Sequence, residues 1–176
     1  MNPLKLDRRK FIKGSTAFAT LASVGVPSMA FSAKAKKYKV GLIGTGWYGK
    51  SDLFRLIQVA DIDVIGIADP DSHLLDEAGK LISQRQKSGK TPKKYKHYRK
   101  MLDENELDIV LVGSPDHWHA LHAIDAIHSG AHVYLQKPIS VDVMEGEAIL
   151  AAARKHNKVV QIGTQRRSTP HLVEAK

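Results

Sequence analysis

Residues 38–49 read YKVGLIGTGWYG, a short apolar run followed by three closely spaced glycines, Gly44, Gly46 and Gly49. The run predicts a strand, and the apolar spacing over residues 51–59 predicts a helix soon after the glycines. A glycine turn between strand and helix is typical of a pyrophosphate cradle. The first glycine permits the turn, the second lets backbone approach the phosphates, and the third lets helix pack close to strand. The start of the helix adds free N–H groups.

A second apolar run, residues 64–68, ends at Asp69, 20 residues after the last of the three glycines. An acidic side chain at this point can accept hydrogen bonds from the ribose hydroxyls of adenosine and repels the 2′-phosphate of NADP. With Thr45, Trp47 and Tyr48 of the loop, the pattern therefore predicts a site for NAD rather than NADP. The alternatives are a purely structural glycine turn and a capping or turn role for Asp69.

Helices and strands alternate along the rest of the chain. The spacing of apolar residues predicts helices over 71–86, 99–105, 118–128 and 142–156, and strands over 95–98, 109–112, 133–135 and 159–162. Asp142 is the expected N-cap of the last helix, with Glu145 three residues on. Short loops between such elements require parallel strands with right-handed crossovers. The predicted fold class is α/β, a doubly wound parallel sheet of the Rossmann type with helices on both faces.

Two further strand ends carry residues suited to a ligand site. SPDHWH, residues 114–119, follows one strand, and QKP, residues 136–138, follows the next. Ligands of such sheets bind at the carboxyl ends of the strands, so both segments are expected to face the crevice that the glycine loop opens onto. Lys137 precedes a proline, which favours an extended backbone. Its side chain is the candidate catalytic group, because a lysine beside a nicotinamide can polarise a substrate hydroxyl or move its proton.

These motifs together resemble the Gfo/Idh/MocA oxidoreductases, the relatives of glucose–fructose oxidoreductase and inositol dehydrogenase. The resemblance rests on the glycine loop, on the two strand-end segments and on GTQRR at residues 163–167, and it covers residues 38–176. The glycine loop is shared with many dehydrogenases, whereas the His-Trp-His and Lys-Pro segments are more specific.

The resemblance also implies roles for single residues. Lys137 matches the lysine of the family's Glu-Lys-Pro motif, which contacts nicotinamide and substrate, and Ser114, Pro115 and His119 match positions that line the cofactor cleft. Gln136 stands where the family commonly has Glu, and its amide can still hydrogen-bond cofactor hydroxyls without bringing charge. The residues assigned to cofactor binding are Gly44, Thr45, Gly46, Trp47, Tyr48, Gly49, Asp69, Ser114, Pro115, His119, Gln136 and Lys137.

By this resemblance the chain is an NAD(P)-dependent oxidoreductase that acts on a sugar or cyclitol hydroxyl by hydride transfer. The family has a second α/β domain that carries much of the sugar site with a catalytic His and Asp, and we expect that domain to be absent here. Residues 36–165 are assigned to the cofactor domain and 166–176 to the start of a truncated second domain. Two alternatives stay open: a non-catalytic dinucleotide-binding fragment and, in a full-length form, a redox-neutral NAD-dependent glycosidase. A homo-oligomer of a full-length form also stays open.

The first 35 residues have the order of an export signal, with basic residues first, an apolar run next and small residues last. Arg8 and Arg9, followed by Phe-Ile-Lys, resemble a twin-arginine signal, which a receptor reads. The apolar run, residues 14–29, is shorter than the roughly 20 residues of a membrane span. We therefore predict a periplasmic or secreted protein that meets the twin-arginine export machinery and has no stable membrane anchor. The alternatives are an uncleaved anchor and a cytosolic tail.

The amino-acid composition excludes several other classes of protein and of binding site. The 176 residues are 43% hydrophobic, enough for one domain with a core, and contain no cysteine, which excludes disulfides and thiolate metal sites. Of the net charge of +9, more than half lies in the first 35 residues, which hold six basic side chains against one acidic. The basic stretch 87–100, with Tyr95 and Tyr98, is interpreted as a solvated loop rather than a nucleic-acid site. His117, His119 and His122 lack a further ligand at metal-binding spacing, so no metal is expected.

Overall fold

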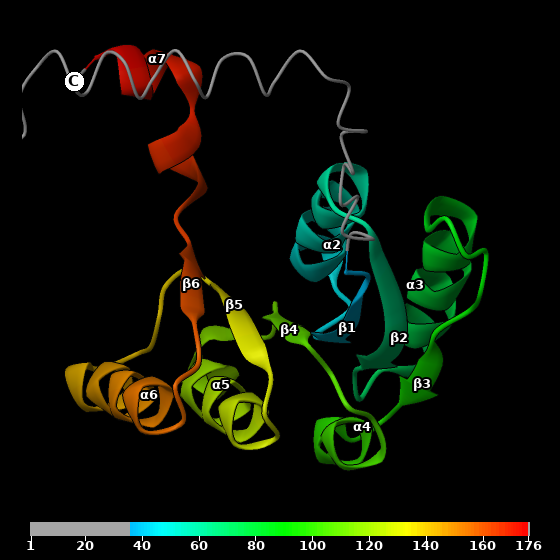
Figure 1. Ribbon diagram of the computed structural model, residues 1–176, viewed down its shortest axis with the longest axis horizontal. Helices are drawn as coiled ribbons and strands as arrows, with labels where there is room; N and C mark the ends of the chain where they lie inside the picture. Colours follow the sequence, from blue (N-terminus) through cyan, green and yellow to red (C-terminus); the bar gives the residue numbers. More distant parts are fainter. Residues whose placement is uncertain (1–35, 176) are drawn as a thin grey trace, which may run out of the picture. The chain divides into compact units, whose positions relative to one another are not determined.

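Six parallel strands form one sheet, ordered β3-β2-β1-β4-β5-β6, in the computed structural model, which describes residues 36–175 (Figure 1). The strands are β1 Tyr38–Ile43, β2 Ile62–Ala68, β3 Lys93–Tyr95, β4 Ile109–Val112, β5 His132–Gln136 and β6 Val160–Gly163. The chain builds outward from β1 in one direction through β2 and β3, then crosses back and builds from β4 to β6. The strand order therefore reverses between β1 and β4, and the predicted doubly wound fold is confirmed.

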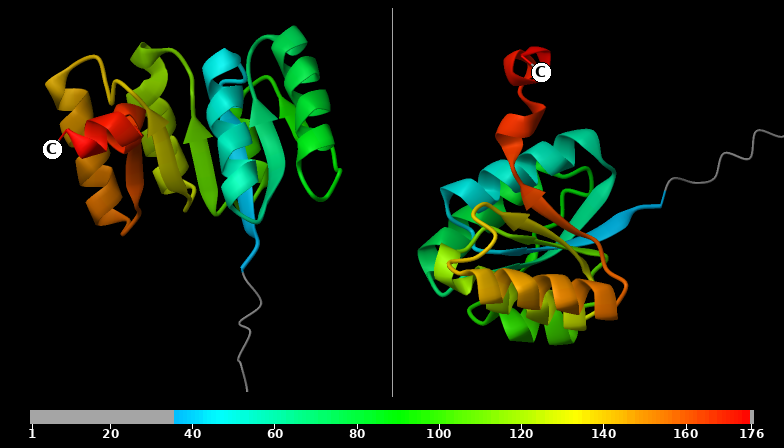
Figure 2. Two further views of the ribbon diagram at one scale, coloured as in Figure 1. Left: turned by 90° about the horizontal axis from the view of Figure 1, so that it is seen from above. Right: turned by 90° about the vertical axis from the view of Figure 1, so that its left-hand side faces the viewer.

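Helices cover both faces of this sheet. They are α2 Trp47–Val59, α3 Ser72–Arg85, α4 Tyr98–Glu104, α5 His119–His128, α6 Val143–Lys155 and the short α7 Pro170–Glu174, with 3-10 turns η1 at Asp116–Trp118 and η2 at Gln165–Ser168. Helices α2 and α3 lie on one face, and α4, α5 and α6 lie on the other (Figures 1 and 2).

The alternation of side chains along the strands divides the core into two layers. In β1, Val40 and Leu42 belong to the buried cluster beneath α2 and α3, whereas Ile43 belongs to the cluster beneath α4, α5 and α6. Leu53 of α2 and Ile82 of α3 close the first layer and are fully buried. Burial of each such side chain contributes about 1.5–3 kcal/mol, so the two layers together hold the helices against both faces of the sheet.

Two helices begin at aspartates that cap them. The Asp71 carboxylate accepts hydrogen bonds from the main-chain N–H groups of His73 at 2.8 Å and Leu74 at 3.3 Å, at the start of α3. The Asp142 carboxylate accepts from the N–H of Glu145 at 2.9 Å, at the start of α6. The predicted cap at Asp142 is thus confirmed, and both carboxylates satisfy N–H groups that a helix start leaves free.

Most elements lie within one or two residues of their predicted bounds, and two, α2 and β3, differ most. Helix α2 begins at Trp47 rather than at residue 51, because its first turn holds the exposed Trp47 and a buried glycine, Gly49, and so lacks the apolar spacing on which the prediction depended. Strand β3 occupies Lys93–Tyr95 rather than 95–98, because Tyr95 pairs with Ala68 while Tyr98 starts α4 and bonds to Asp125. Both shifts depend on contacts between elements, which local sequence spacing does not report.

The described helices also bear on membrane association. Within residues 36–175, no helix has both the length and the apolarity that a membrane crossing requires. The predicted export signal, residues 1–35, lies outside the described residues.

Candidate functional site

The ends of β1, β2 and β4 are tied together where the strand order reverses. The N–H of Gly44, just after β1, donates to the carbonyl of Ala68 at the end of β2 at 2.9 Å. The N–H of Gly113, just after β4, donates to the carbonyl of Ile43 at 2.8 Å. The glycine loop therefore lies at the point of the sheet where dinucleotides bind in this architecture.

Three glycines pack here backbone to backbone. Gly44 has φ +88°, and a Cβ at this position would lie 2.7 Å from the carbonyl carbon of Gly113 and from the nitrogen of Ser114. A Cβ at Gly49 would collide with the carbonyl oxygen of Gly44, and one at Gly113 would lie 2.7 Å from the Cα of Gly49. No side chain fits at any of the three. Gly113 was not assigned to the site from the sequence, although a glycine directly after a buried strand is a usable signal.

Gly46 has a different environment. Its φ of −62° and ψ of −176° are open to any residue, and a Cβ there would have no neighbour within 4 Å. Gly46 is the N-cap of α2 and makes no side-chain cap bond, so it leaves the first-turn N–H groups of this helix free for an anion. Next to it Trp47 is 76% exposed. The open approach and the helix end fit a pyrophosphate.

Asp69 holds the glycine loop in place. Its Oδ2 accepts hydrogen bonds from the main-chain N–H of Thr45 at 2.7 Å and from the Thr45 hydroxyl at 3.1 Å. Its Oδ1 accepts from the N–H of Asp71 at 3.0 Å. Asp71, not Asp69, caps α3. Each carboxylate oxygen can accept more than one bond, so Asp69 keeps capacity for a ribose hydroxyl, which stays a prediction.

His119 joins the two strand-end segments. The ring is fully buried, with Nδ1 2.6 Å from the carbonyl oxygen of Pro138 and Nε2 2.9 Å from that of Ser114. Both oxygens only accept, so both bonds form together only when the ring carries two protons. The structure thus gives His119 a bridging position between the loop after β4 and the loop after β5. Its contact with a cofactor, like that of the exposed Pro115, stays a prediction.

His122 lies one turn further along α5. Its Nδ1 is 2.9 Å from the Ser114 hydroxyl, and its ring stacks on Trp118 and meets the Tyr98 ring edge-on. Burial lowers the pKa of His122 to about 4, so the ring is neutral near neutral pH. Within residues 36–175, no cluster of three or more His, Cys, Asp or Glu side chains is placed to hold a metal ion.

Gln136 ends β5 and Lys137 follows it, and both lie beside the first two turns of α2. The Gln136 side chain is 5% exposed, and its Nε2 donates to the carboxylate of Asp52 while its Oε1 accepts from the N–H of Lys137 at 2.7 Å. The amide is therefore occupied by protein groups, and its expected bond to a cofactor hydroxyl stays a prediction. The Lys137 side chain is exposed, with Nζ 5.8 Å from the centre of the Tyr48 ring. Asp52 was not identified from the sequence, because nothing local marks a helix carboxylate as a partner of a distant strand end.

Most of the basic stretch is ion-paired. Salt bridges join Lys87 to Asp61, Lys93 and Lys100 to Glu104, Lys94 to Asp76, and Arg99 to Asp125. These pairs offset much of the local positive charge, which fits a solvated surface.

The model of the Gfo/Idh/MocA oxidoreductase family, described as having an NAD-binding Rossmann fold, matches residues 38–164, well over half of the chain. The chain belongs to the Gfo/Idh/MocA oxidoreductase family. Residues 38–164 are thus the NAD-binding Rossmann domain of this family, and the expected cofactor, NAD, is confirmed at that level.

Known relatives of this Gfo/Idh/MocA chain act on different molecules. It is 29% identical over 131 residues to an alpha-N-acetylgalactosaminidase of Shewanella oneidensis, covering 71% of this chain and 28% of that protein. It is 26% identical over 140 residues to an inositol 2-dehydrogenase of Salmonella typhimurium, covering 78% of this chain and 40% of that protein. The chain therefore spans less than half the length of these relatives.

A solved structure shares the fold. The scyllo-inositol dehydrogenase of Lactobacillus casei, solved with bound NAD(H) and scyllo-inositol, superposes with a TM-score of 0.68 at 24% identity, over 80% of this chain and 40% of that one. At this level of identity the likeness establishes the architecture alone.

Proposed function

We propose that this chain binds NAD along the ends of β1, β2, β4 and β5 and serves hydride transfer at a hydroxyl-bearing carbon of a sugar or cyclitol. One observation carries the proposal: the glycine loop, Asp69 and Lys137 all follow the carboxyl ends of parallel strands, on the same side of the sheet. The loop leaves open backbone at Gly46 for a pyrophosphate, and Lys137 reaches back over α2 toward Tyr48.

Different residues of the chain bind different parts of the cofactor and the substrate. The N–H groups of the first turn of α2 bind the pyrophosphate, and Asp69 accepts hydrogen bonds from the adenosine ribose. NAD, when bound, supplies the acceptor of a hydride. Lys137 binds the oxygen of the substrate hydroxyl and takes up or relays its proton as the carbon is oxidised. Because the Lys137 side chain is exposed, a polyol can approach it from solvent.

The test uses the purified protein in a form that carries the family's second α/β domain, with NAD and a panel of cyclitols and aldoses, and measures reduced nicotinamide by absorbance. Wild type should reduce NAD with at least one polyol, and Lys137→Met should lose this activity while NAD affinity changes little. A chain that binds NAD and reduces none with any polyol would contradict hydride transfer and leave a dinucleotide-binding module. Equal activity of wild type and Lys137→Met would contradict the assigned role of the lysine.

A redox-neutral glycosidase is the second candidate, favoured by the likeness to an alpha-N-acetylgalactosaminidase. Such a glycosidase would need NAD but would be redox-neutral, so it would build up no reduced nicotinamide. A chromogenic N-acetylgalactosaminide distinguishes the two. Release of the chromophore that needs NAD but builds up no reduced nicotinamide supports the glycosidase, and a net build-up with a free polyol supports the dehydrogenase.

We also propose export by the twin-arginine route to the periplasm or beyond. Support comes from the order of basic, apolar and small residues over 1–35 and from the pair Arg8 and Arg9. This route carries folded proteins, which suits a protein that must keep NAD bound outside the cytoplasm.

A further inference from the structure

The Gln136 amide lies between a carboxylate and a main-chain N–H. Its Nε2 donates to Asp52, and its Oε1 accepts from the N–H of Lys137 at 2.7 Å. An ionised carboxylate only accepts and a main-chain N–H only donates, so one orientation of the amide satisfies both partners. The buried side chain is therefore held at both ends.

We propose that Asp52 is a positioning residue for Lys137 and acts through Gln136. The inference rests on the proposed function only in that Lys137 works at the nicotinamide end of the site. Asp52 holds the NH2 group, which leaves Oε1 facing the N–H of Lys137 and fixes the main chain from which the lysine side chain extends. Without an acceptor at position 52, the buried NH2 group of Gln136 would have no hydrogen-bond partner. The amide would then turn toward another acceptor and give up its bond to the N–H of Lys137.

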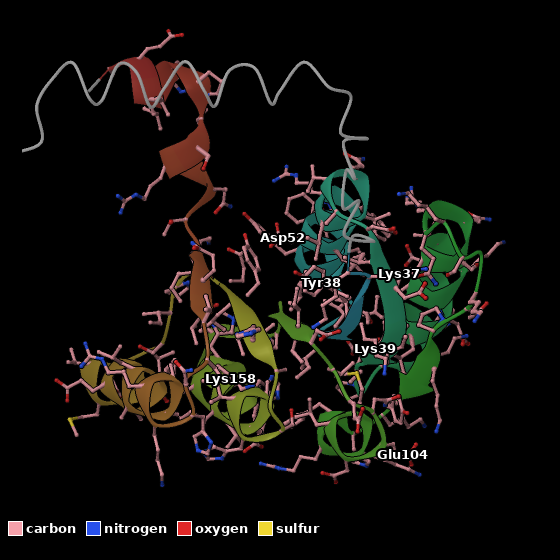
Figure 3. All side chains as sticks on the ribbon, in the orientation of Figure 1. Lys37, Tyr38, Lys39, Asp52, Glu104 and Lys158 are labelled. Carbon is pink, nitrogen blue, oxygen red and sulfur yellow. The ribbon has the colours of Figure 1, made fainter. Side chains whose placement is uncertain are left out.

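Asp52 connects the two halves of the site. It lies in the second turn of α2, the helix whose first turn follows the glycine loop, and Figure 3 labels it on this helix. Burial raises the pKa of Asp52, whereas the bond from Gln136 and the charge of Arg55 act in the opposite direction. One helix therefore presents its start to the pyrophosphate and supports the lysine segment one turn later.

Packing leaves the Gln136 amide little freedom to shift sideways. Gly163 of β6 pairs with Gln136 in the sheet, and a Cβ at Gly163 would lie 3.0 Å from the Gln136 Nε2 and 2.8 Å from the Tyr134 hydroxyl. The amide fills the space that a side chain at 163 would need. Loss of its bond to Asp52 thus favours a change of orientation over a small displacement.

The Lys137 side chain depends on this arrangement. Its Nζ lies 5.8 Å from the centre of the Tyr48 ring, in the first turn of α2, and the Tyr48 hydroxyl accepts a hydrogen bond from Gln165. A shift of the main chain at 137 would move the ammonium group relative to the glycine loop. That shift should weaken contacts to the nicotinamide end of a bound dinucleotide and leave contacts to the adenosine end unchanged.

The first experiment changes donors and acceptors in the 176-residue chain. Asp52→Asn keeps an acceptor for Gln136 and should behave nearly as wild type, whereas Asp52→Leu removes it. Gln136→Glu sets two carboxylates against each other and should lower the unfolding midpoint. The double change Asp52→Asn with Gln136→Glu exchanges donor and acceptor, and should restore the midpoint. Asp63→Leu is the matched control, because Asp63 of β2 is also half-buried but its carboxylate pairs with Lys37, away from Gln136.

The second experiment measures the affinities for two ligands and the position of one NMR resonance. Titration with NAD and with ADP-ribose, followed by tryptophan fluorescence, should show about fivefold weaker NAD binding in Asp52→Leu, the effect of one lost hydrogen bond, with ADP-ribose affinity unchanged. The main-chain amide resonance of Lys137 should shift in Asp52→Leu, and in the double variant it should keep its wild-type position. Asp63→Leu should change neither the NAD affinity nor this resonance.

The outcomes separate this inference from the proposed function. Unchanged NAD affinity and an unmoved Lys137 resonance in Asp52→Leu would overturn it, and so would equal losses of NAD and ADP-ribose. If Asp52→Leu does not fold, failure of the double variant to recover from Gln136→Glu would overturn it. A wild-type chain that binds neither ligand would count against the proposed function, and the Lys137 resonance would still decide the inference.

Discussion

The main-chain N–H of Thr45 donates a hydrogen bond to the carboxylate of Asp69 at 2.7 Å, and the Thr45 hydroxyl donates to the same oxygen at 3.1 Å. Thr45 is fully buried, so its N–H has no access to water as an alternative partner. Asp69 therefore has two tasks, to shape the loop that receives the pyrophosphate and to offer an acceptor to the ribose.

Two substitutions separate these tasks of Asp69. Asp69→Ala leaves the buried N–H of Thr45 without an acceptor and should cost about 1–3 kcal/mol of unfolding free energy. Asp69→Asn keeps an oxygen for Thr45 and should cost less, yet it removes the charge that rejects a 2′-phosphate. We expect NAD affinity to fall about tenfold or more in Asp69→Ala, and the preference for NAD over NADP to shrink in both variants. Denaturant unfolding and titration with each nucleotide measure these effects, and unchanged dissociation constants would remove the assigned role.

Substitution by alanine should have different effects on stability and NAD affinity at Gly46 and at Gly49. Gly46→Ala meets no neighbour within 4 Å, so unfolding free energy should change by less than about 1 kcal/mol, while NAD affinity falls at least about tenfold because the methyl group occupies the pyrophosphate approach. Gly49→Ala would collide with the Gly44 carbonyl and should cost about 3 kcal/mol or more. Gly146→Ala in α6 is the control and should leave NAD binding unaltered. Full NAD affinity in Gly46→Ala would place the phosphates elsewhere.

The stability of the chain should depend on pH through His122. Its folded-state pKa is lowered to about 4 from an ordinary 6.5, mainly by burial, with Arg99 and His119 acting in the same direction and Asp125 in the opposite one. Between these two values the unfolded chain takes up a proton that the folded chain refuses, so stability is complete above pH 6.5 and falls as the pH is lowered toward about 4. We expect the loss to be about 2 kcal/mol larger in wild type than in His122→Gln, after allowance for solvent screening. Parallel pH profiles of unfolding free energy for the two proteins would contradict this account.

The export proposal has a simple genetic test. Arg8→Lys with Arg9→Lys keeps the charge of the first segment but removes the pair that a twin-arginine receptor reads. The variant should stay in the cytoplasm, whereas wild type should appear in the periplasm or the medium, as measured by cell fractionation and immunoblotting. Export of the variant at the wild-type level would exclude this route.

Local sequence patterns were enough to predict the fold class and most of the helices and strands. The apolar runs predicted the strands and helices, because such runs repeat with the period of each element, and the glycine spacing with Asp69 predicted the dinucleotide loop between the first strand and the first helix. The cap at Asp142 also followed from local chemistry.

Relations between distant residues could not be read in the same way. The bond between Asp52 and Gln136 joins positions 84 apart, and both ring nitrogens of His119 meet carbonyl groups from two different loops. The packing of Gly113 against Gly49 likewise exists only once β1 and β4 lie side by side. Such contacts depend on the assembled sheet, and no single stretch of sequence encodes them.

NMR titration of the purified wild-type chain with NAD tests the central claim most directly. We expect saturable binding, with the largest amide shifts at Gly44, Gly46, Gly49 and Asp69 and a smaller shift at Lys137. Absence of saturable binding, or binding that leaves the glycine-loop resonances unmoved, would contradict the account.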